Sequence, residues 1–364
     1  MKIGTIIGAR PQFIKAAPVS RALRELGIAE VVIHTGQHYD SDMSEIFFRE
    51  LRMKPPDYHL GIGSGSHGVQ TGKMLAEVER VVLSEQPDLV LVYGDTNSTL
   101  AGSLVAAKVR IPSAHVEAGL RSFNRSMPEE VNRIVADVLA DTLFAPTEVA
   151  RANLEAEGIR GEKVHVVGDV MFDVALEHGS DAVRRRATLS EFGLNDGNYL
   201  LATIHRAENT DNPERLRVII EALLEAGKII PVIWPIHPRT KHRLAELGIK
   251  TGSETQLRVI APVGYLQMAS LEAGAALIVT DSGGVQKEAF FHRVPCVTVR
   301  FETEWLELVA MGWNRLAPPS DVRSVVQAIQ GAIGTVGKPG QPYGSGHAAR
   351  QIADILSREI GPRR

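Results

Sequence analysis

The feature that most constrains the fold is a regular alternation between short β-branched runs and longer amphipathic segments. Runs that are apolar on both faces and are each followed by a helical pattern are typical of a parallel sheet covered by helices. In the first half of the chain these runs are residues 2–7, 31–34, 89–93, 114–116, 142–144 and 164–167. In the second half they are residues 199–204, 229–234, 257–260, 276–280 and 296–299. The pattern predicts an α/β protein with parallel sheets and right-handed crossovers.

The alternation pauses between Gly168 and Asn198, in a charged stretch that ends in turn-forming residues. The length of 364 residues is more than twice that of a typical domain. We therefore predict an N-terminal Rossmann-like domain over residues 1–170 and a C-terminal one over residues 171–345. Residues 346–364 are expected to form a final helix that packs back on either domain.

Charge and cysteine content exclude several classes of partner and site. The 40 basic and 43 acidic residues sum to −3, so no excess positive charge attracts a nucleic acid or an anionic membrane. Cys296 is the single cysteine, which excludes an internal disulfide and a Cys-based zinc site. No apolar run approaches the roughly 20 residues of a membrane span, and the first one is too short for a signal peptide. We expect a cytoplasmic protein.

Open parallel sheets bind ligands where their strands end, so the residues just after each expected strand are the candidates for a site. The first such loop, residues 8–15, has neither the G-x-G-x-x-G of a dinucleotide turn nor the Gly-Lys-Ser/Thr of a P-loop. It places Arg10 and Lys15 around a helix start, where free N–H groups and the helix dipole favour an anion. A capped helix with both cations solvated is the alternative.

Acidic residues follow the third and fourth expected strands. Asp95 and Glu117 come at the ends of these two strands, and Glu129 lies in the first turn of the next expected helix. Taken singly, Asp95 is explained as a helix cap and Glu129 as a favourable charge near a helix start. We expect the three acids to converge beside Arg121, where charged neighbours separate carboxyl pKa values for acid and base work.

Histidines occupy equivalent places in the second half. His205 follows one expected strand and His237 the next, each with an arginine nearby. Imidazole and guanidinium groups suit a diphosphate and also transfer protons. A structural role for either histidine is the alternative.

Residues 276–288 form the most specific stretch. A strand ends in Asp281 and Ser282, followed by Gly283 and Gly284, whose backbone can approach a phosphate closely at a helix start. Glu288 lies one turn further, where it can accept hydrogen bonds from a ribose diol. The flanks of Ser282 do not match a G-x-S-x-G nucleophile elbow. A turn without a ligand is the alternative, and the scattered histidines lead us to expect no metal site.

Together these motifs resemble one family, the non-hydrolysing UDP-N-acetylglucosamine 2-epimerases. The resemblance runs nearly end to end, over residues 8–15, 34–38, 94–96, 115–121, 128–133, 205–206 and 281–288. It implies a fold like the GT-B glycosyltransferases, with two Rossmann-like domains and the active site between them, and a homodimer. It also implies inversion at carbon 2 of a UDP-sugar by anti elimination of UDP, a bound glycal intermediate and re-addition of UDP. No cofactor is implied.

The resemblance also implies roles for individual residues. It makes Asp95, Glu117, Glu129 and His205 catalytic. It assigns the UDP phosphates to Arg10, Lys15, Ser282, Gly283 and Gly284, with His237 also reaching them, and the ribose to Glu288.

Two segments depart from the pattern of better-known bacterial members. Trp305 stands where those members have an arginine near UDP, and Arg300 is the candidate to replace that guanidinium. The residues after Gln37 and His38 differ from the pattern of members with a regulatory UDP-sugar site, which puts allosteric activation in doubt.

The preferred sugar stays open at this point. The amino-acid sequences of residues 8–15 and 205–211 are more similar to those of a subgroup that acts on UDP-2,3-diacetamido-2,3-dideoxyglucuronate. Archaeal enzymes that act on UDP-N-acetylglucosamine share part of these sequences. A GT-B-type glycosyltransferase and a catalytically silent nucleotide-sugar sensor are the alternatives. The acids of the first domain argue against the transferase.

Overall fold

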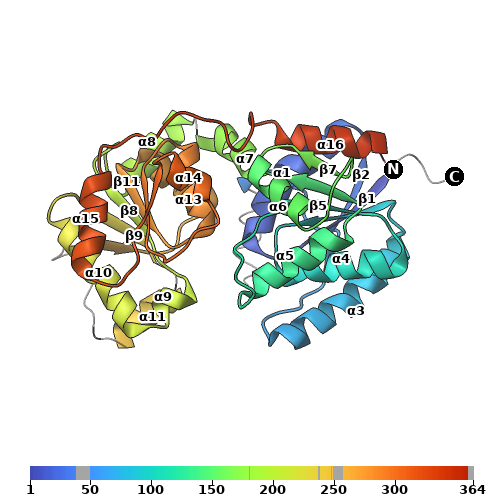
Figure 1. The fold of residues 1–364 in the computed structure, drawn as a ribbon, viewed down its shortest axis with the longest axis horizontal. Helices are drawn as coiled ribbons and strands as arrows, with labels where there is room; N and C mark the ends of the chain where they lie inside the picture. Colours follow the sequence, from blue (N-terminus) through green and yellow to red (C-terminus); the bar gives the residue numbers. More distant parts are fainter. Residues whose placement is uncertain (38–49, 180, 237, 247, 249–256, 360–364) are drawn as a thin grey trace. The chain divides into compact units, whose positions relative to one another are not determined.

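The computed structural model describes residues 1–37, 50–179, 181–236, 238–246, 248 and 257–359 (Figure 1). The chain forms two compact units, and each is described by itself. Unit 1 comprises Met1–Val174 with Gln341–Arg364, and unit 2 comprises Ala175–Gly340. No helix in the described part of the chain has the length and apolarity needed to cross a membrane.

Unit 1 is built on a parallel sheet of seven strands in the order β3-β2-β1-β4-β5-β6-β7. The order reverses between β1 and β4, so the carboxyl ends of these central strands are the expected place for a ligand. The strands are β1 (Lys2–Ile7), β2 (Ala29–His34), β3 (Tyr58–His59), β4 (Leu89–Tyr93), β5 (Ser113–Val116), β6 (Thr142–Ala145) and β7 (Val164–Val166). The helices are α1 (Arg10–Glu25), α3 (His67–Glu85), α4 (Asn97–Val109), α5 (Pro128–Leu139), α6 (Glu148–Ala156) and α16 (Ala348–Glu359). Helix α7 (Val170–Gly179) begins in unit 1 and ends in unit 2.

Unit 2 repeats this architecture with a parallel sheet of six strands in the order β10-β9-β8-β11-β12-β13. The strands are β8 (Leu200–Thr203), β9 (Val232–Pro235), β10 (Leu257–Ile260), β11 (Leu277–Thr280), β12 (Cys296–Thr298) and β13 (Asn314–Leu316). The helices are α8 (Ala182–Glu191), α9 (Ala207–Thr210), α10 (Pro213–Gly227), α11 (Pro238–Glu246), α12 (Tyr265–Gly274), α13 (Gly283–Phe291), α14 (Leu306–Ala310) and α15 (Val322–Ala332). The predicted fold class, two Rossmann-like units with parallel sheets, is confirmed.

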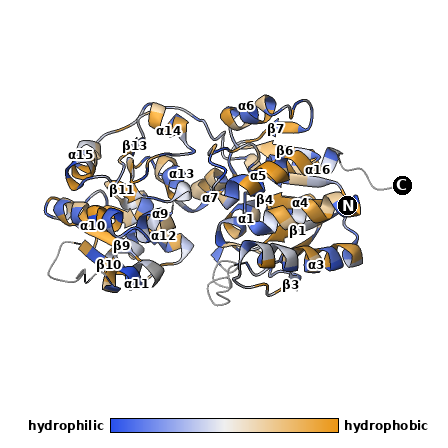
Figure 2. Ribbon diagram, turned by 60° about the horizontal axis from the view of Figure 1, so that its bottom comes forward, coloured by the Kyte–Doolittle hydropathy of each residue, from blue (hydrophilic) through white to orange (hydrophobic). Residues whose placement is uncertain are grey.

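Apolar strands make the core of each unit. In unit 1, Ile6 pairs with Ile33 on one side and Val92 on the other, and all three are fully buried. In unit 2, Leu277 pairs with Leu200, and both are fully buried. The helices that cover the sheets carry both apolar and polar residues (Figure 2), as amphipathic helices on a buried sheet must.

The end of the chain returns to unit 1, where α16 packs beside α1 (Figure 1). Asp173 of α7 accepts hydrogen bonds from the backbone N–H groups of Ala348 and Ala349, at 3.1 and 2.7 Å. These two N–H groups begin a helix and have no carbonyl partner within it, so a carboxylate there is stabilising. The contact fixes the start of α16.

A helix occupies the charged stretch that interrupts the alternation of strands and helices. This helix, α8, begins after Asp181, whose side chain accepts a hydrogen bond of 2.9 Å from the backbone N–H of Arg184. The short edge strands β3 and β13 are also absent from the sequence prediction. At two and three residues, they are too short to show a period-2 pattern.

Candidate active site

The loop after β1 is shaped by a glutamine that sequence reasoning did not single out. Gln12 is 1% exposed, and its Oε1 accepts hydrogen bonds from the backbone N–H groups of Gly8 and Ala9 at 2.8 and 3.1 Å. Its Nε2 donates to the carbonyl of Tyr93 at 2.8 Å. The amide therefore ties the loop after β1 to the end of β4. Arg10, at the first position of α1, is partly exposed at this edge.

The turn after β4 brings a glycine against an ion pair. Gly94 has φ of +61°, and a Cβ there would lie 3.2 Å from both Glu117 Oε2 and Lys15 Nζ. Because a side chain would both strain the backbone and crowd the pair, this position needs glycine. The pair itself joins the Lys15 ammonium of α1 to Glu117 after β5, with side chains 13% and 8% exposed.

Glu117 itself has an unusual backbone conformation. Its φ is +72°, in a region that residues other than glycine seldom adopt and that costs about 1–3 kcal/mol. The backbone N–H groups of Glu117 and Ala118 both donate to the carbonyl of Phe144, each at 3.1 Å. Such strain at a buried acid beside a cation is typical of a functional site.

Asp95 lies one residue after Gly94 and is held by α5. Its carboxylate pairs with Arg133, and its backbone carbonyl accepts a hydrogen bond of 2.9 Å from Asn132. The Asp95 side chain remains 31% exposed, whereas that of Arg133 is 7% exposed. The structure thus brings Asp95 and Glu117 to the ends of adjacent strands, each with its own cation.

The prediction that the three candidate acids converge beside Arg121 is wrong. Its guanidinium is buried and pairs with Asp137 at 2.7 Å and with Glu157 at 2.6 Å. Arg121 instead contacts the buried carboxylate of Asp137 in α5 and the partly exposed carboxylate of Glu157, just after α6. Lys15 and Arg133 are the cations that contact the candidate acids.

The two glutamates at the start of α5 differ in exposure. Glu129 is exposed. Glu130 is 1% exposed, and it accepts hydrogen bonds from the backbone N–H groups of Ser122 and Phe123 at 2.9 and 3.0 Å. Glu130 is therefore the structural member of the pair, and Glu129 is the one accessible to a ligand.

In unit 2 a fully buried aspartate organises the turn after β8. The carboxylate of Asp281 accepts hydrogen bonds from the backbone N–H groups of His205 and Arg206 at 3.0 and 3.1 Å, and from Asn209 Nδ2 at 3.0 Å. The imidazole of His205 is 47% exposed, with Nδ1 3.8 Å from Asp281. Asp281 thus positions a histidine that faces solvent. His237 lies outside the described residues.

Helix α13 begins with the glycine pair. Ser282 is the residue before its first turn, and Gly284 is exposed. A Cβ at Gly283 or Gly284 would meet no atom nearer than 3.8 Å, so packing within the unit does not require glycine at either position. The free N–H groups of a helix start bind anions, and two glycines let a phosphate come close to them. Glu288, one turn further, is 8% exposed.

Arg300 forms an ion pair with Glu304, the residue before Trp305. Arg300 forms two hydrogen bonds to Glu304, at 3.0 and 3.1 Å, and its side chain is 2% exposed. Burial acts to raise the pKa of Glu304, but the guanidinium of Arg300 outweighs it and holds this pKa below its usual range. Arg300 is therefore committed to an internal ion pair, which argues against its suggested contact with UDP.

Trp305 contributes to the same corner of unit 2. Its Nε1 donates to the carbonyl of Gly283 at 2.8 Å, and its ring covers the ammonium of Lys287 at 4.3 Å. Trp305 thus supports the start of α13.

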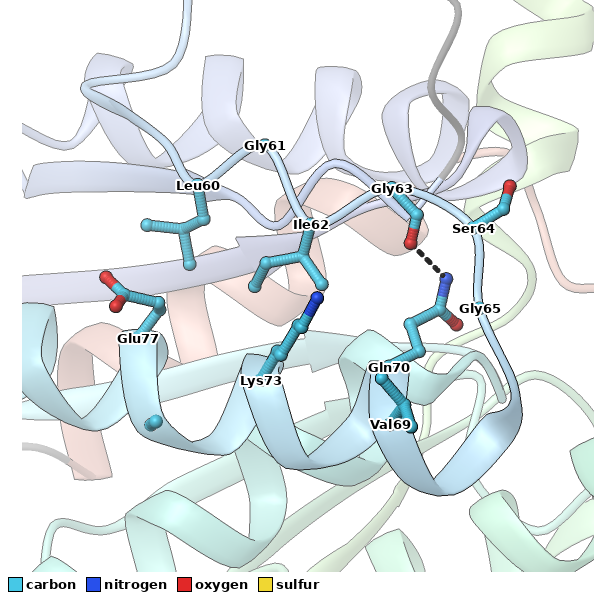
Figure 3. A pocket seen from close by; sticks show the side chains of 11 residues that line it. Leu60, Gly61, Ile62, Gly63, Ser64, Gly65, Val69, Gln70, Lys73 and Glu77 are labelled. Atoms are coloured by element: carbon cyan, nitrogen blue, oxygen red, sulfur yellow. Dashed lines mark hydrogen bonds between the residues drawn. The ribbon is translucent and has the colours of Figure 1, made fainter.

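A hollow of about 370 Å³ lies in unit 1 between α3 and the glycine-rich loop 60–65 (Figure 3). None of the predicted site residues lines it. Figure 3 shows Lys73 and Glu77 rising from α3 toward this loop, and Gln70 donating to the Gly63 carbonyl at 3.0 Å. The candidate acids do not line this hollow, so cavity size does not identify the site here.

Most residues whose roles were not predicted from the sequence hold the turns that carry the predicted site residues. Gln12, Asn132, Arg133 and Asp281 hold the turns that present Arg10, Asp95 and His205. Arg133 had a usable signal, because it lies three residues after Glu130 on one face of a helix. Asp281 lies in a stretch that was singled out from the sequence, but its role as a buried support was not predicted, because a buried aspartate and an accessible one look alike in a sequence.

Comparison with known proteins shows the family of this chain. The sequence model of the UDP-N-acetylglucosamine 2-epimerase family matches residues 21–357. A UDP-2,3-diacetamido-2,3-dideoxy-D-glucuronate 2-epimerase of Pseudomonas aeruginosa is 52% identical, over 98% of this chain and all of its own. A UDP-N-acetylglucosamine 2-epimerase of Methanocaldococcus jannaschii is 46% identical, over 98% of this chain and 99% of its own.

Solved structures show the same similarity in three dimensions. The crystal structure of the Methanocaldococcus jannaschii enzyme with UDP-GlcNAc and UDP has a TM-score of 0.91, at 46% identity over 98% of this chain and 100% of that one. That of the Neisseria meningitidis enzyme bound to UDP-GlcNAc has a TM-score of 0.89, at 31% identity over 99% of this chain and 100% of that one. The chain belongs to the UDP-N-acetylglucosamine 2-epimerase family.

Proposed function

We propose that this protein inverts carbon 2 of a UDP-2-acetamido sugar by anti elimination of UDP, a bound glycal intermediate and re-addition of UDP. The observation that carries the proposal is the pair of acids at the ends of adjacent strands β4 and β5, in a chain that matches 2-epimerases over nearly its whole length. A homodimer in the cytoplasm is part of the same proposal.

The acids of unit 1 suit the elimination step, in which the proton on carbon 2 is removed and UDP departs. A proton on carbon 2 of a sugar is weakly acidic, so departure of UDP must be advanced when the proton is removed. Carboxylates stabilise the oxocarbenium-like charge of such a transition state. Asp95 and Glu117 are buried enough to interact strongly with a bound sugar, and Glu129 is accessible for proton transfer.

The groups of unit 2 suit the leaving diphosphate. Ser282, Gly283 and Gly284 present the start of α13, where a helix favours negative charge. The exposed imidazole of His205 stabilises the charge that develops as UDP departs. Arg10, Lys15 and His237 are proposed to contact the phosphates, and Glu288 the ribose.

The substrate is proposed to be UDP-N-acetylglucosamine or UDP-2,3-diacetamido-2,3-dideoxyglucuronate. The relative that is 52% identical is named for the second sugar, and the one that is 46% identical for the first. Incubating the purified protein with each sugar in deuterated buffer, followed by NMR, tests both. We expect the manno epimer of one of them with deuterium at carbon 2. Inversion without deuterium uptake contradicts the elimination mechanism, and no inversion of either sugar contradicts the function.

A further inference from the structure

His115 lies in the sheet of unit 1, directly beneath the turns that carry the candidate acids. It belongs to β5, and its side chain is fully buried. Its Nδ1 is 2.7 Å from Asp137 Oδ1, and its Nε2 is 2.7 Å from the carbonyl oxygen of Gly94. The ring therefore bridges α5 to the residue just before Asp95.

Both ring nitrogens face atoms that accept hydrogen bonds. A carbonyl oxygen has no proton, so Nε2 must donate to Gly94. Asp137 receives hydrogen bonds from Arg121 Nη1 at 2.7 Å and from the backbone N–H of Gly119 at 3.1 Å, which is the environment of an ionised carboxylate. Nδ1 must then also donate, and a neutral imidazole has only one N–H.

The charged groups around the ring are consistent with an imidazole that donates from both nitrogens. Burial acts to raise the pKa of Asp137, but His115 and Arg121 outweigh it and hold this pKa below its usual range. Arg121 is in turn neutralised by Glu157, at 2.6 Å.

We propose that His115 is an imidazolium that acts as a positioning residue, holding the turns of Asp95 and Glu117 through its contacts with Gly94 and Asp137. One turn is held directly, through the Gly94 carbonyl. The other is held through Asp137, which bonds the N–H of Gly119 two residues after Glu117. The proposal rests on the proposed function for its catalytic part only, because the charge of the ring is measurable without substrate.

The strained backbone explains why such a clamp is needed. Glu117 has a positive φ, and relaxation of its backbone to an unstrained conformation would move its carboxylate out of place. A displacement of about 1 Å at a reacting group can cost roughly 100-fold in rate. The charged groups that face this region are Asp137 from α5, Arg121 after β5, and the Lys15–Glu117 pair against Gly94.

The first test measures the charge of the ring. We expect that, in protein labelled with ¹⁵N-histidine, both ring nitrogens of His115 carry protons at pH 7.5. The signals are assigned by their loss in His115→Gln. A ring nitrogen without a proton at pH 7.5 overturns the proposal, whether or not the protein is an epimerase.

The second test separates positioning from a merely structural role. We expect His115→Gln to lower kcat about 10- to 100-fold, with the Kd for UDP unchanged and a native circular dichroism spectrum. The matched control is His165→Gln, on β7 of the same sheet, where the imidazole is tilted against the ring of Phe144, with the ring centroids 5.8 Å apart. Wild-type kcat in folded His115→Gln, or an equal loss in the control, contradicts the proposal.

A third variant keeps the ring and removes its counter-charge. In Asp137→Asn the amide can donate a hydrogen bond to Nδ1, so the ring no longer needs a second proton, and we expect one ring nitrogen of His115 to be unprotonated at pH 7.5. The kcat of this variant should fall as it does in His115→Gln, because the backbone N–H of Gly119 loses its charged acceptor. A ring that keeps both protons in folded Asp137→Asn contradicts the proposal, and if the variant does not fold, the ¹⁵N measurement on the wild type still decides it.

Discussion

The two sheets carry acids at equivalent places, just after central strands, but use them in opposite ways. In unit 1, Asp95 keeps 31% of its side chain exposed and pairs with one arginine. In unit 2, Asp281 is fully buried, and its carboxylate oxygens accept hydrogen bonds from two backbone N–H groups and one side-chain amide. The group left facing solvent there is an imidazole.

The difference shows how similar architecture serves two chemical tasks. At the proposed site for the sugar, side-chain cations hold the carboxylates of Asp95 and Glu117. At the proposed diphosphate site, the carboxylate of Asp281 is fully buried, and the free backbone N–H groups of the start of α13 remain for an anion. A negative side chain at the start of α13 would repel the ligand that this helix favours.

The largest expected effect tests the acids of unit 1. We predict that Glu117→Gln lowers kcat about 1,000-fold, because the amide can neither accept a proton nor carry the charge that stabilises the transition state. NMR of the epimerisation measures the rate, and calorimetry should show that UDP binding is retained. Glu148→Gln, an exposed acid of α6 in the same unit, is the control. Full turnover in Glu117→Gln removes that residue from the mechanism.

The next effect concerns the buried acid of unit 2. Asp281→Asn is expected to cost about 2 kcal/mol of unfolding free energy, because an amide offers one acceptor oxygen to three donors. Asp95→Asn should cost less, since water can solvate that side chain. Differential scanning calorimetry compares the two variants. Equal losses would mean that exposure does not distinguish the two acids.

A smaller effect separates ligand binding from packing at α13. We predict that Gly284→Ala raises the Kd for UDP about tenfold, or roughly 1.4 kcal/mol, because a methyl group occupies space that a phosphate needs. The melting temperature should not fall, since no protein atom lies within 3.8 Å of the added carbon. The same change at Gly72 of α3, where a Cβ meets open space, is the control. Unchanged UDP affinity in Gly284→Ala argues against a phosphate at this turn.

The smallest effect is a pH dependence in unit 2. The pKa of Glu304 is lower in the folded state than its ordinary value of 4.5, so its ion pair with Arg300 stabilises the fold above about pH 4.5. That contribution is lost as the pH falls through the folded pKa. We therefore expect the melting temperature of Glu304→Gln to fall less than that of the wild type between pH 6 and pH 4. A parallel decline in both proteins contradicts this assignment.

Much of the fold and several site residues follow from the sequence. The bounds of β1 and β4 are predicted to the residue, because both are apolar on both faces and are followed by helices. Positions such as Asp95 and Glu117 are found because strand ends in a parallel sheet point to one edge. The short strands β3 and β13 are not found, because pairing with a neighbour defines them rather than their own composition.

The sequence by itself determined the class of fold, the family and the residue types at the edges of the sheets, since these depend on local periodicity and on motifs. Only the tertiary structure decided which charges meet. Arg121 pairs with Asp137 and Glu157, from helices 16 and 36 residues further along the chain, instead of with the candidate acids. Glu129 and Glu130 are adjacent in sequence yet differ in exposure, because successive residues of a helix point in different directions and only one of them meets the loop before α5.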